Sequence, residues 1–211
     1  MGWDLRSECS LTYAVAVNTK ARRAQPLTPE DRRASILDAA VPLLMEFGSD
    51  VTTRQLADAA GVAEGTLFRV FEDKQAIIDA AVARFLDPTP TIAALTAIDP
   101  HLSLEDKVEH VVDIVRRRFA GVTGILTALG LREPPAALKG HANPGDKGRS
   151  AAAALLEPHR DELRVDPEQV VHILRLLCLA AALPPMGAIR PTSNREIVDV
   201  VLHGVMKNKR K

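Results

Sequence analysis

The sequence is poor in the residues from which cross-links, metal sites and catalytic sites are usually built. Its 211 residues include only 2 cysteines, Cys9 and Cys178, which lie far apart and form no CxxC pair. This spacing argues against a disulfide framework and against a zinc site. The 6 histidines show no ligand spacing such as HExxH, and no serine lies in a nucleophile-elbow motif. We therefore expect no metal, no cofactor and no enzymatic activity.

A net charge and a long apolar run are also missing. Lys plus Arg and Asp plus Glu both number 27, so the total charge does not indicate nucleic acid. Phosphate contacts depend on local cations, however, and residues 20–33 carry five basic and two acidic side chains, an excess of +3. The longest apolar run, Leu176–Ile189, is interrupted by prolines and is too short to span a bilayer. Because the N-terminus does not resemble a signal peptide, we expect a soluble, cytoplasmic protein.

Apolar residues recur at helical spacing along the chain, and no stretch alternates like a strand, so the expected fold is all-α. Thr28 and Pro29 form a helix start, and Gly48 ends the apolar run that follows. Four more residues suit the N-cap of a helix: Asp73, Ser103, Asp166 and Ser193. Gly121 and Gly124 predict a break in the helix after Ser103, and residues 132–149 predict a loop before a helix that begins at Ser150.

Residues 52–74, TTRQLADAAGVAEGTLFRVFEDK, contain the most informative pattern. Thr52 and Gln55 have the spacing of a capping box at the start of a short helix. Gly61 follows that helix, where a sharp turn needs a positive φ. A second short helix is expected from Glu64, with Leu67 among the side chains that point inward. Two short helices around a tight glycine turn are typical of the helix-turn-helix motif, whose second helix lies in the major groove of DNA.

These residues resemble the tetracycline-repressor (TetR) family of regulators. The matching elements are Thr52, Thr53, Ala57, Ala60-Gly61-Val62, Gly65-Thr66-Leu67-Phe68, Phe71 and Lys74. The resemblance covers about residues 30–86, and the rest matches in length and helical layout only. It implies a three-helix helix-turn-helix DNA-binding domain at 28–86 and a helical effector-binding and dimerisation domain at 87–211. Residues 1–27 show no sustained period and are expected to be a disordered or flexible arm. Pro88 and Pro90 are expected to mark the boundary between the two domains.

Nine residues are expected to face DNA: Thr52, Thr53, Arg54, Glu64, Gly65, Thr66, Phe68, Arg69 and Lys74. The two threonines suit a phosphate oxygen, although Thr52 serves equally well as a helix cap. Gly65 lets DNA approach closely, while Arg69 suits bidentate readout of guanine. Lys74 is expected to neutralise a phosphate.

Residues 170–183 are apolar almost all round, and such a helix must be covered on every side. A dimer is expected because the TetR resemblance places dimerisation on the last two helices. The expected interface consists of Val170, Leu174, Leu177, Ala181, Ile197, Val200, Val201 and Gly204. The alternative is that these side chains form the core of a single chain. Five apolar residues are candidate walls of an effector pocket: Phe85, Val111, Val115, Phe119 and Leu126. With 3% aromatic residues, such a pocket would be aliphatic and suit an apolar effector.

The sequence thus predicts a homodimeric transcriptional repressor that leaves a palindromic operator in double-stranded DNA when a small apolar effector binds. The alternative is a helical dimeric adaptor that does not bind DNA specifically. Two features are consistent with that alternative: Pro42 lies within the first helix, and position 70 of the motif is Val.

Overall fold

The computed structural model describes residues 28–131, 144–183 and 192–205, and within these ranges the chain forms helices and no β-strand. The expected all-α class is therefore confirmed. In chain order the elements are α2 (Pro29–Phe47), η1 (Gly48–Asp50), α3 (Thr53–Ala60), α4 (Glu64–Val70), α5 (Lys74–Leu86), α6 (Thr89–Thr96), α7 (Leu104–Ala128), α8 (Pro144–Leu156), η3 (Glu157–Glu162), α9 (Pro167–Ala182) and α11 (Asn194–Val205). The expected arm at 1–27 lies outside the described residues.

Local side-chain caps fix where most of these helices begin. Asp31 N donates to the Thr28 hydroxyl at the start of α2, and the side chains of Asp73, Ser103 and Asp166 accept backbone N–H groups in the same way. Each such cap stabilises its helix by about 1 kcal/mol. Helix α2 also continues through Pro42 without ending. The helix starts expected at Thr28, Asp73, Ser103 and Asp166 are thus confirmed.

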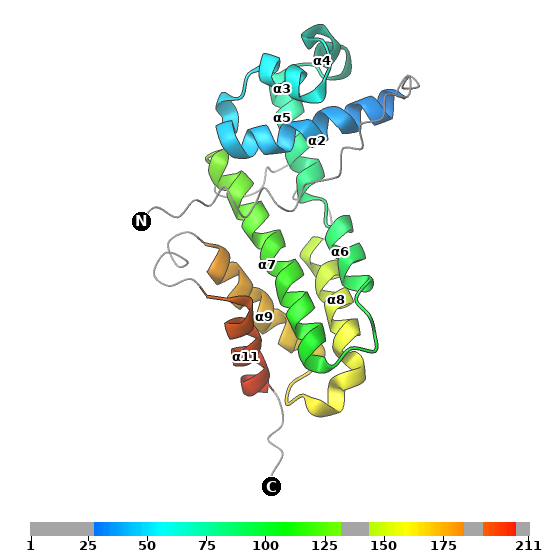
Figure 1. Cartoon of the computed structure of the whole chain (residues 1–211), viewed down its shortest axis with the longest axis vertical. Helices are drawn as coiled ribbons and strands as arrows, with labels where there is room; N and C mark the ends of the chain where they lie inside the picture. The colour runs from blue at the N-terminus through cyan, green and yellow to red at the C-terminus, as the bar shows by residue number, and fades with distance from the viewer. Residues whose placement is uncertain (1–27, 132–143, 184–191, 206–211) are drawn as a thin grey trace.

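Two hydrophobic cores divide the molecule into an upper head and a lower body, as Figure 1 shows. The head core gathers buried residues of α2 to α5, whereas the body core gathers those of α6 to α11. Helix α7 belongs to both, because its Val111 packs in the body core and its Ile125 packs in the head core. A single helix therefore spans from one core to the other.

The expected break at Gly121 and Gly124 is wrong, since α7 runs without interruption to Ala128. A Cβ on Gly121 would lie 2.9 Å from the Phe85 ring, and one on Gly124 would lie 3.7 Å from the Met45 sulfur. Both glycines thus face the head. They allow α7 to approach it closely, and the packing outweighs the loss of about 1 kcal/mol per glycine in a helix.

Two further boundaries differ from expectation. Helix α8 begins at Pro144, so the last residues of the expected loop at 132–149 are helical, while residues 132–143 lie outside the described part. The proline at the first helical position needs no N–H partner and therefore suits this start. Helix α6 was not expected, because Pro88 and Pro90 were interpreted as a boundary; here they lie at the start of a helix, where proline is tolerated.

Candidate nucleic-acid interface

The helix-turn-helix forms as the sequence predicts. Thr52 accepts a hydrogen bond from Gln55 N, and the Gln55 side chain accepts from Thr52 N at 2.8 Å, which completes the capping box of α3. Gly61 ends α3 with φ 65° and ψ 32°, and helix α4 then starts at Glu64. Leu67 is fully buried in the head core and anchors α4.

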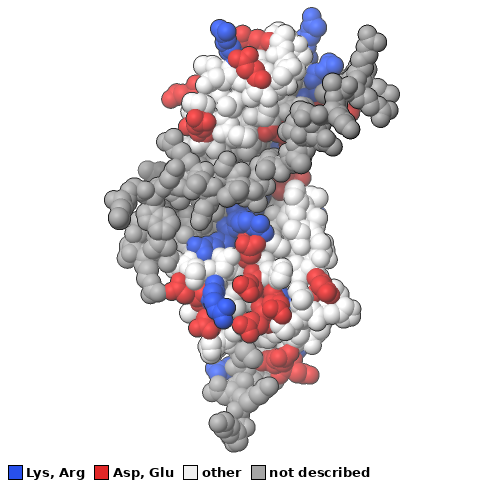
Figure 2. Space-filling view, in the orientation of Figure 1, with Lys and Arg blue, Asp and Glu red and all other residues white. Residues whose placement is uncertain are grey.

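The opposite side of α4 is open. Gly65 is exposed, and a Cβ placed there would meet no atom within 4 Å. Phe68 leaves 49% of its surface exposed although it is aromatic, and Arg69 is exposed beside it. In Figure 2, Lys and Arg side chains project from the end of the molecule that carries α3 and α4. The head thus presents small, apolar and cationic groups together on one short helix.

The nine candidate DNA residues all lie at this end of the head, and none is buried. Six of them are exposed: Thr52, Arg54, Glu64, Gly65, Phe68 and Arg69. Thr53, Thr66 and Lys74 are half-buried. None of the nine side chains is therefore enclosed in the head core.

Several of the nine side chains already hold internal contacts. The Thr53 hydroxyl donates to the Glu64 carboxylate, which ties the start of α3 to the start of α4. The Lys74 ammonium donates to the carbonyls of Ser49 and Val51, at 3.0 and 3.1 Å. One of its three protons is left for another acceptor. Glu64 and Lys74 thus help to build the motif itself.

Arg33 is a further head residue that the sequence analysis did not place at the site. Its guanidinium donates to the carbonyl of Val70, the last residue of α4, at 3.2 Å and lies 4.3 Å from the centroid of the Phe71 ring. Arg33 therefore fastens the C-terminal end of α4 to α2. The only sequence signal for it was the local excess of basic residues at 20–33.

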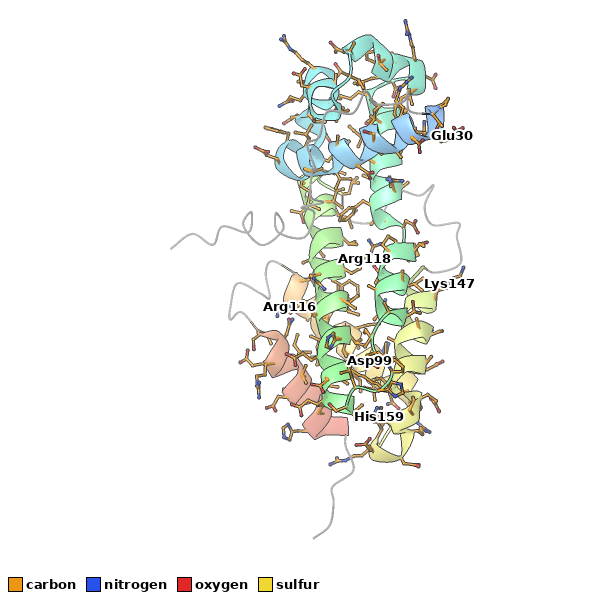
Figure 3. The ribbon with its side chains drawn as sticks, turned by 45° about the vertical axis from the view of Figure 1, so that its right-hand side comes forward. Glu30, Asp99, Arg116, Arg118, Lys147 and His159 are labelled. Carbon is orange, nitrogen blue, oxygen red and sulfur yellow. The ribbon has the colours of Figure 1, made fainter. Side chains whose placement is uncertain are left out.

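The junction of head and body depends on Arg118. This residue of α7 donates to the carbonyls of Phe85 and Leu86, each at 2.6 Å, and thus binds the last turn of α5, beside which Figure 3 places it. Burial lowers the pKa of the Arg118 guanidinium, and the nearby Asp87 carboxylate opposes that shift. The pKa of Asp87 is itself lowered, chiefly because its carboxylate accepts hydrogen bonds from the backbone and hydroxyl of Thr89.

The five candidate pocket residues are divided between the two cores. Val111 and Val115 are buried in the body core, and Phe119 packs against it. Phe85 and Leu126, both half-buried, pack against the head core instead. The structure therefore brings these residues together only along α7 and at its junction with α5.

The candidate dimer residues also separate into two groups. Four have at most 3% of their surface exposed within a single chain and belong to the body core: Val170, Leu174, Ile197 and Val201. A side chain buried in its own chain cannot contact a second chain, so the assignment of these four to an interface is corrected to core packing. Leu177 and Ala181 are half-buried, whereas Val200 and Gly204 are exposed.

Two other kinds of site are missing from the described residues. No three His, Cys, Asp or Glu side chains there lie close enough together to hold a metal ion. Among the described helices, none combines the length and apolar character that crossing a membrane requires.

Comparison with known proteins shows what the head is similar to. Residues 36–81 match the family model described as bacterial regulatory proteins, tetR family. The match begins in α2 and ends in α5, so it contains the whole helix-turn-helix. The head of this chain is thus similar to the DNA-binding domain of the TetR family.

Two relatives resemble parts of this chain. The uncharacterized HTH-type transcriptional regulator YvkB of Bacillus subtilis (strain 168) is 32% identical over 101 residues, which are 44% of this chain and 52% of that protein. The HTH-type transcriptional repressor KstR2 of Rhodococcus jostii (strain RHA1) is 42% identical over 57 residues, 26% of this chain and 28% of that protein. The chain thus spans about half or less of the relatives it matches.

A solved structure extends the likeness in fold to the body of this chain. A TetR-family transcriptional regulator from Haemophilus influenzae superposes with a TM-score of 0.54, covering 84% of this chain and 98% of that one. The two sequences are 15% identical, so the likeness concerns the fold.

Proposed function

We propose that this chain is a sequence-specific DNA-binding transcription regulator that acts as a homodimer on a palindromic operator. The observation that carries the proposal is the open side of α4, where Gly65 has no neighbour and Phe68 is half exposed on an otherwise well-packed head. An exposed helix of this kind, braced by α3, is the element that helix-turn-helix proteins insert into the major groove. The family match to the same residues supports it.

Six of the nine residues are proposed to contact DNA in two ways. Gly65, Thr66 and Phe68 lie in the first turns of α4, the part that meets base edges. The start of α3, with Thr52, Thr53 and Arg54, supplies hydroxyl, backbone and guanidinium donors for phosphates of the adjoining backbone. Glu64 positions the two helix starts through its bond to the Thr53 hydroxyl, and Lys74 has one proton left for a phosphate.

Dimerisation is proposed through the exposed side of α9 and α11, which lie side by side in Figure 1. One stripe of α9 is buried in the body: Val170, Val171, Leu174 and Cys178. A second apolar stripe is left partly or fully exposed: Ile173, Leu176, Leu177 and Ala180. A second copy of the chain would cover this stripe together with Val200 of α11. Two-fold pairing then places the half-sites about 34–36 Å, or a multiple of that, apart.

The test of DNA binding is Gly65→Leu. A Cβ at this position meets no atom within 4 Å, and leucine is a better helix former than glycine, so folding is expected to be retained. The same side chain stands between α4 and the base edges, so operator binding is lost. Ala154→Leu, at an exposed position of α8, is the matched control. Selection of bound sites from random duplexes, followed by mobility shift, gives the measurement. If the unaltered protein selects no DNA, or selects DNA without sequence preference, the adaptor alternative is favoured.

An apolar effector is proposed to release the operator by moving α7 relative to α5. Arg118 and the contact of Gly121 with Phe85 join these two helices, and α5 adjoins the helix-turn-helix. A coupling free energy of about 1–3 kcal/mol would change operator affinity by roughly 5–150-fold. The family member KstR2 is called a repressor, which supports repression as the sign of regulation.

Calorimetry with straight-chain aliphatic alcohols and carboxylic acids tests this effector proposal. A tight binder should lower operator affinity, and Arg118→Met should reduce that effect while leaving binding of the same compound intact. A compound that binds tightly without changing operator affinity contradicts effector-driven release.

A further inference from the structure

A pocket of about 260 Å³ opens between the first turns of α2 and the last turn of α4. Its walls are Pro29, Glu30, Arg33, Arg69 and Val70. Figure 3 shows Glu30 at the N-terminal end of α2, beside the helix-turn-helix. Two cationic side chains and one anionic side chain line it, which gives a net charge of +1 (2 − 1). The pocket thus favours an anion.

One of the two arginines is held in place. Arg33 donates to the Val70 carbonyl at 3.2 Å and stacks over the Phe71 ring at 4.3 Å. Its guanidinium carries five N–H donors, so most of them remain for a ligand while the group is fixed. A preorganised planar guanidinium is well suited to phosphate oxygens, because little side-chain freedom is lost on binding.

The other arginine lies away from the end of α4 that meets bases. Arg69 is the sixth of the seven residues of α4, in its last turn. Base edges are met mainly by the N-terminal residues of a recognition helix, whereas phosphate contacts surround them. Arg69 shares the pocket with Arg33 of a different helix, so both arginines border the same space.

We infer that this pocket, named here the α2–α4 pocket, binds one backbone phosphate of the operator through Arg33 and Arg69. The inference rests on the proposed DNA-binding function and refines it, because it extends the DNA contact to α2. It also replaces the sequence-based role of Arg69 as a reader of guanine. Glu30 also lines the pocket, and its carboxylate repels a phosphate, so the phosphate is expected beside the two arginines.

The first test compares Arg33→Gln and Arg69→Gln with Arg32→Gln. Arg32 is a neighbouring cation on α2 that does not line the pocket and so controls for general loss of charge. Each pocket variant should weaken operator binding about tenfold, the effect of one charged hydrogen bond. The double variant should reduce the slope of log affinity against log salt by about 0.9 per half-site, the value for a single phosphate.

Sequence preference separates a phosphate contact from a base contact. With the inferred role, Arg69→Gln weakens the selected operator and each of its single-base variants by the same factor. With guanine readout, Arg69→Gln instead relaxes the preference at one base pair and leaves the salt slope unchanged. The latter result would overturn the inference.

Neutral methylphosphonates placed one at a time along the operator backbone identify the phosphate. At one position flanking the half-site, the substitution should weaken binding by the unaltered protein. On that modified operator, neither Arg33→Gln nor Arg69→Gln should lower the affinity further. If no position has this effect, the pocket does not hold a phosphate. Arg69 is exposed, so its variant keeps the fold even if Arg33→Gln disturbs α4.

Failure of the wider proposal gives a different result. A chain that selects no DNA at all refutes sequence-specific binding. A chain that selects an operator but shows no coupling between either arginine and a phosphate refutes only the role of the α2–α4 pocket.

Discussion

At the scale of single residues, the body contains two polar groups that the proposed function does not use. Cys178 is fully buried in the body core, and burial raises the pKa of its thiol to about 11. Lys107 is 1% exposed, and its ammonium lies 3.0 Å from Nε2 of His159. The His159 Nδ1 lies 2.7 Å from the Glu162 carboxylate. In the tautomer whose Nδ1–H donates to this carboxylate, Nε2 is the acceptor for Lys107.

The Cys178 thiol is expected to be inert in the folded protein. In a Cys9→Ser variant, where Cys178 is the one remaining cysteine, a disulfide reagent should label no thiol at neutral pH until urea is added. The raised pKa means that the thiol contributes stability fully below about pH 9 and that this contribution is lost as the pH rises through about 11. Rapid labelling without urea would contradict the buried, protonated state.

The Lys107–His159 contact gives a second residue-scale prediction. His159→Leu should lower the free energy of unfolding by about 1–3 kcal/mol, because the buried ammonium loses its acceptor. Lys107→Met keeps the aliphatic stem and removes the charge, so it should be close to neutral or stabilising.

Urea unfolding of the two single variants and of the double variant measures the coupling. The double variant should be more stable than His159→Leu alone, because no unpaired charge remains. Additive effects would mean that the two side chains do not interact.

At the scale of elements, two glycines with positive φ have different reasons for being glycine. Gly48, at the end of α2, has φ 57° and ψ −136°, and a Cβ there would lie 2.1 Å from the Ala128 carbonyl oxygen of α7. Gly61, in the helix-turn-helix, has φ 65° and ψ 32°, and a Cβ there would meet no atom within 4 Å. Only the first is constrained by a neighbouring helix as well as by its backbone.

The prediction is that Gly61→Ala costs about 1–2 kcal/mol, the strain of a left-handed residue alone. Gly48→Ala should cost about 3 kcal/mol, the upper end for a strained site, because α2 and α7 must also separate. Thermal unfolding of the two variants provides the comparison. Equal losses would show that the contact between α2 and α7 adds nothing.

Some features of the elements can be predicted from local sequence patterns alone, and others cannot. The capping box of Thr52 and Gln55 and the turn at Gly61 lie within a few residues of each other, so their side chains and backbone settle them locally. Gly121 was misinterpreted because its role depends on Phe85, which lies far away in the sequence. The α2–α4 pocket was missed for the same reason, since Arg33 meets Val70 only after α2 and α4 have packed.

At the scale of the whole molecule, α7 joins the two cores. The exposed apolar stripe of α9 forms part of the proposed dimer interface. Leu176 and Val200 are 54% and 63% exposed, on two neighbouring helices. Covering one such side chain is worth about 1.5–3 kcal/mol. The apolar surface is therefore large enough to matter for association.

Leu176→Asp and Val200→Asp should each weaken self-association by about 10–100-fold, since each places a charge on the proposed interface. Ala154→Asp, at an exposed site on α8, should leave association unchanged. Sedimentation at several protein concentrations is the measurement, and operator affinity should fall together with dimer content. A dimer that survives both substitutions lies on another surface.

The sequence alone determined the helical class, most helix starts and the helix-turn-helix, because caps, turns and apolar spacing act between residues a few positions apart. The tertiary structure decided which apolar residues of α9 and α11 are core, how α7 spans both cores, and that Arg33 and Arg69 share one pocket. Those outcomes depend on packing between helices distant in the chain. An apolar or basic residue has the same local pattern whether it meets its own core, a second chain or a phosphate.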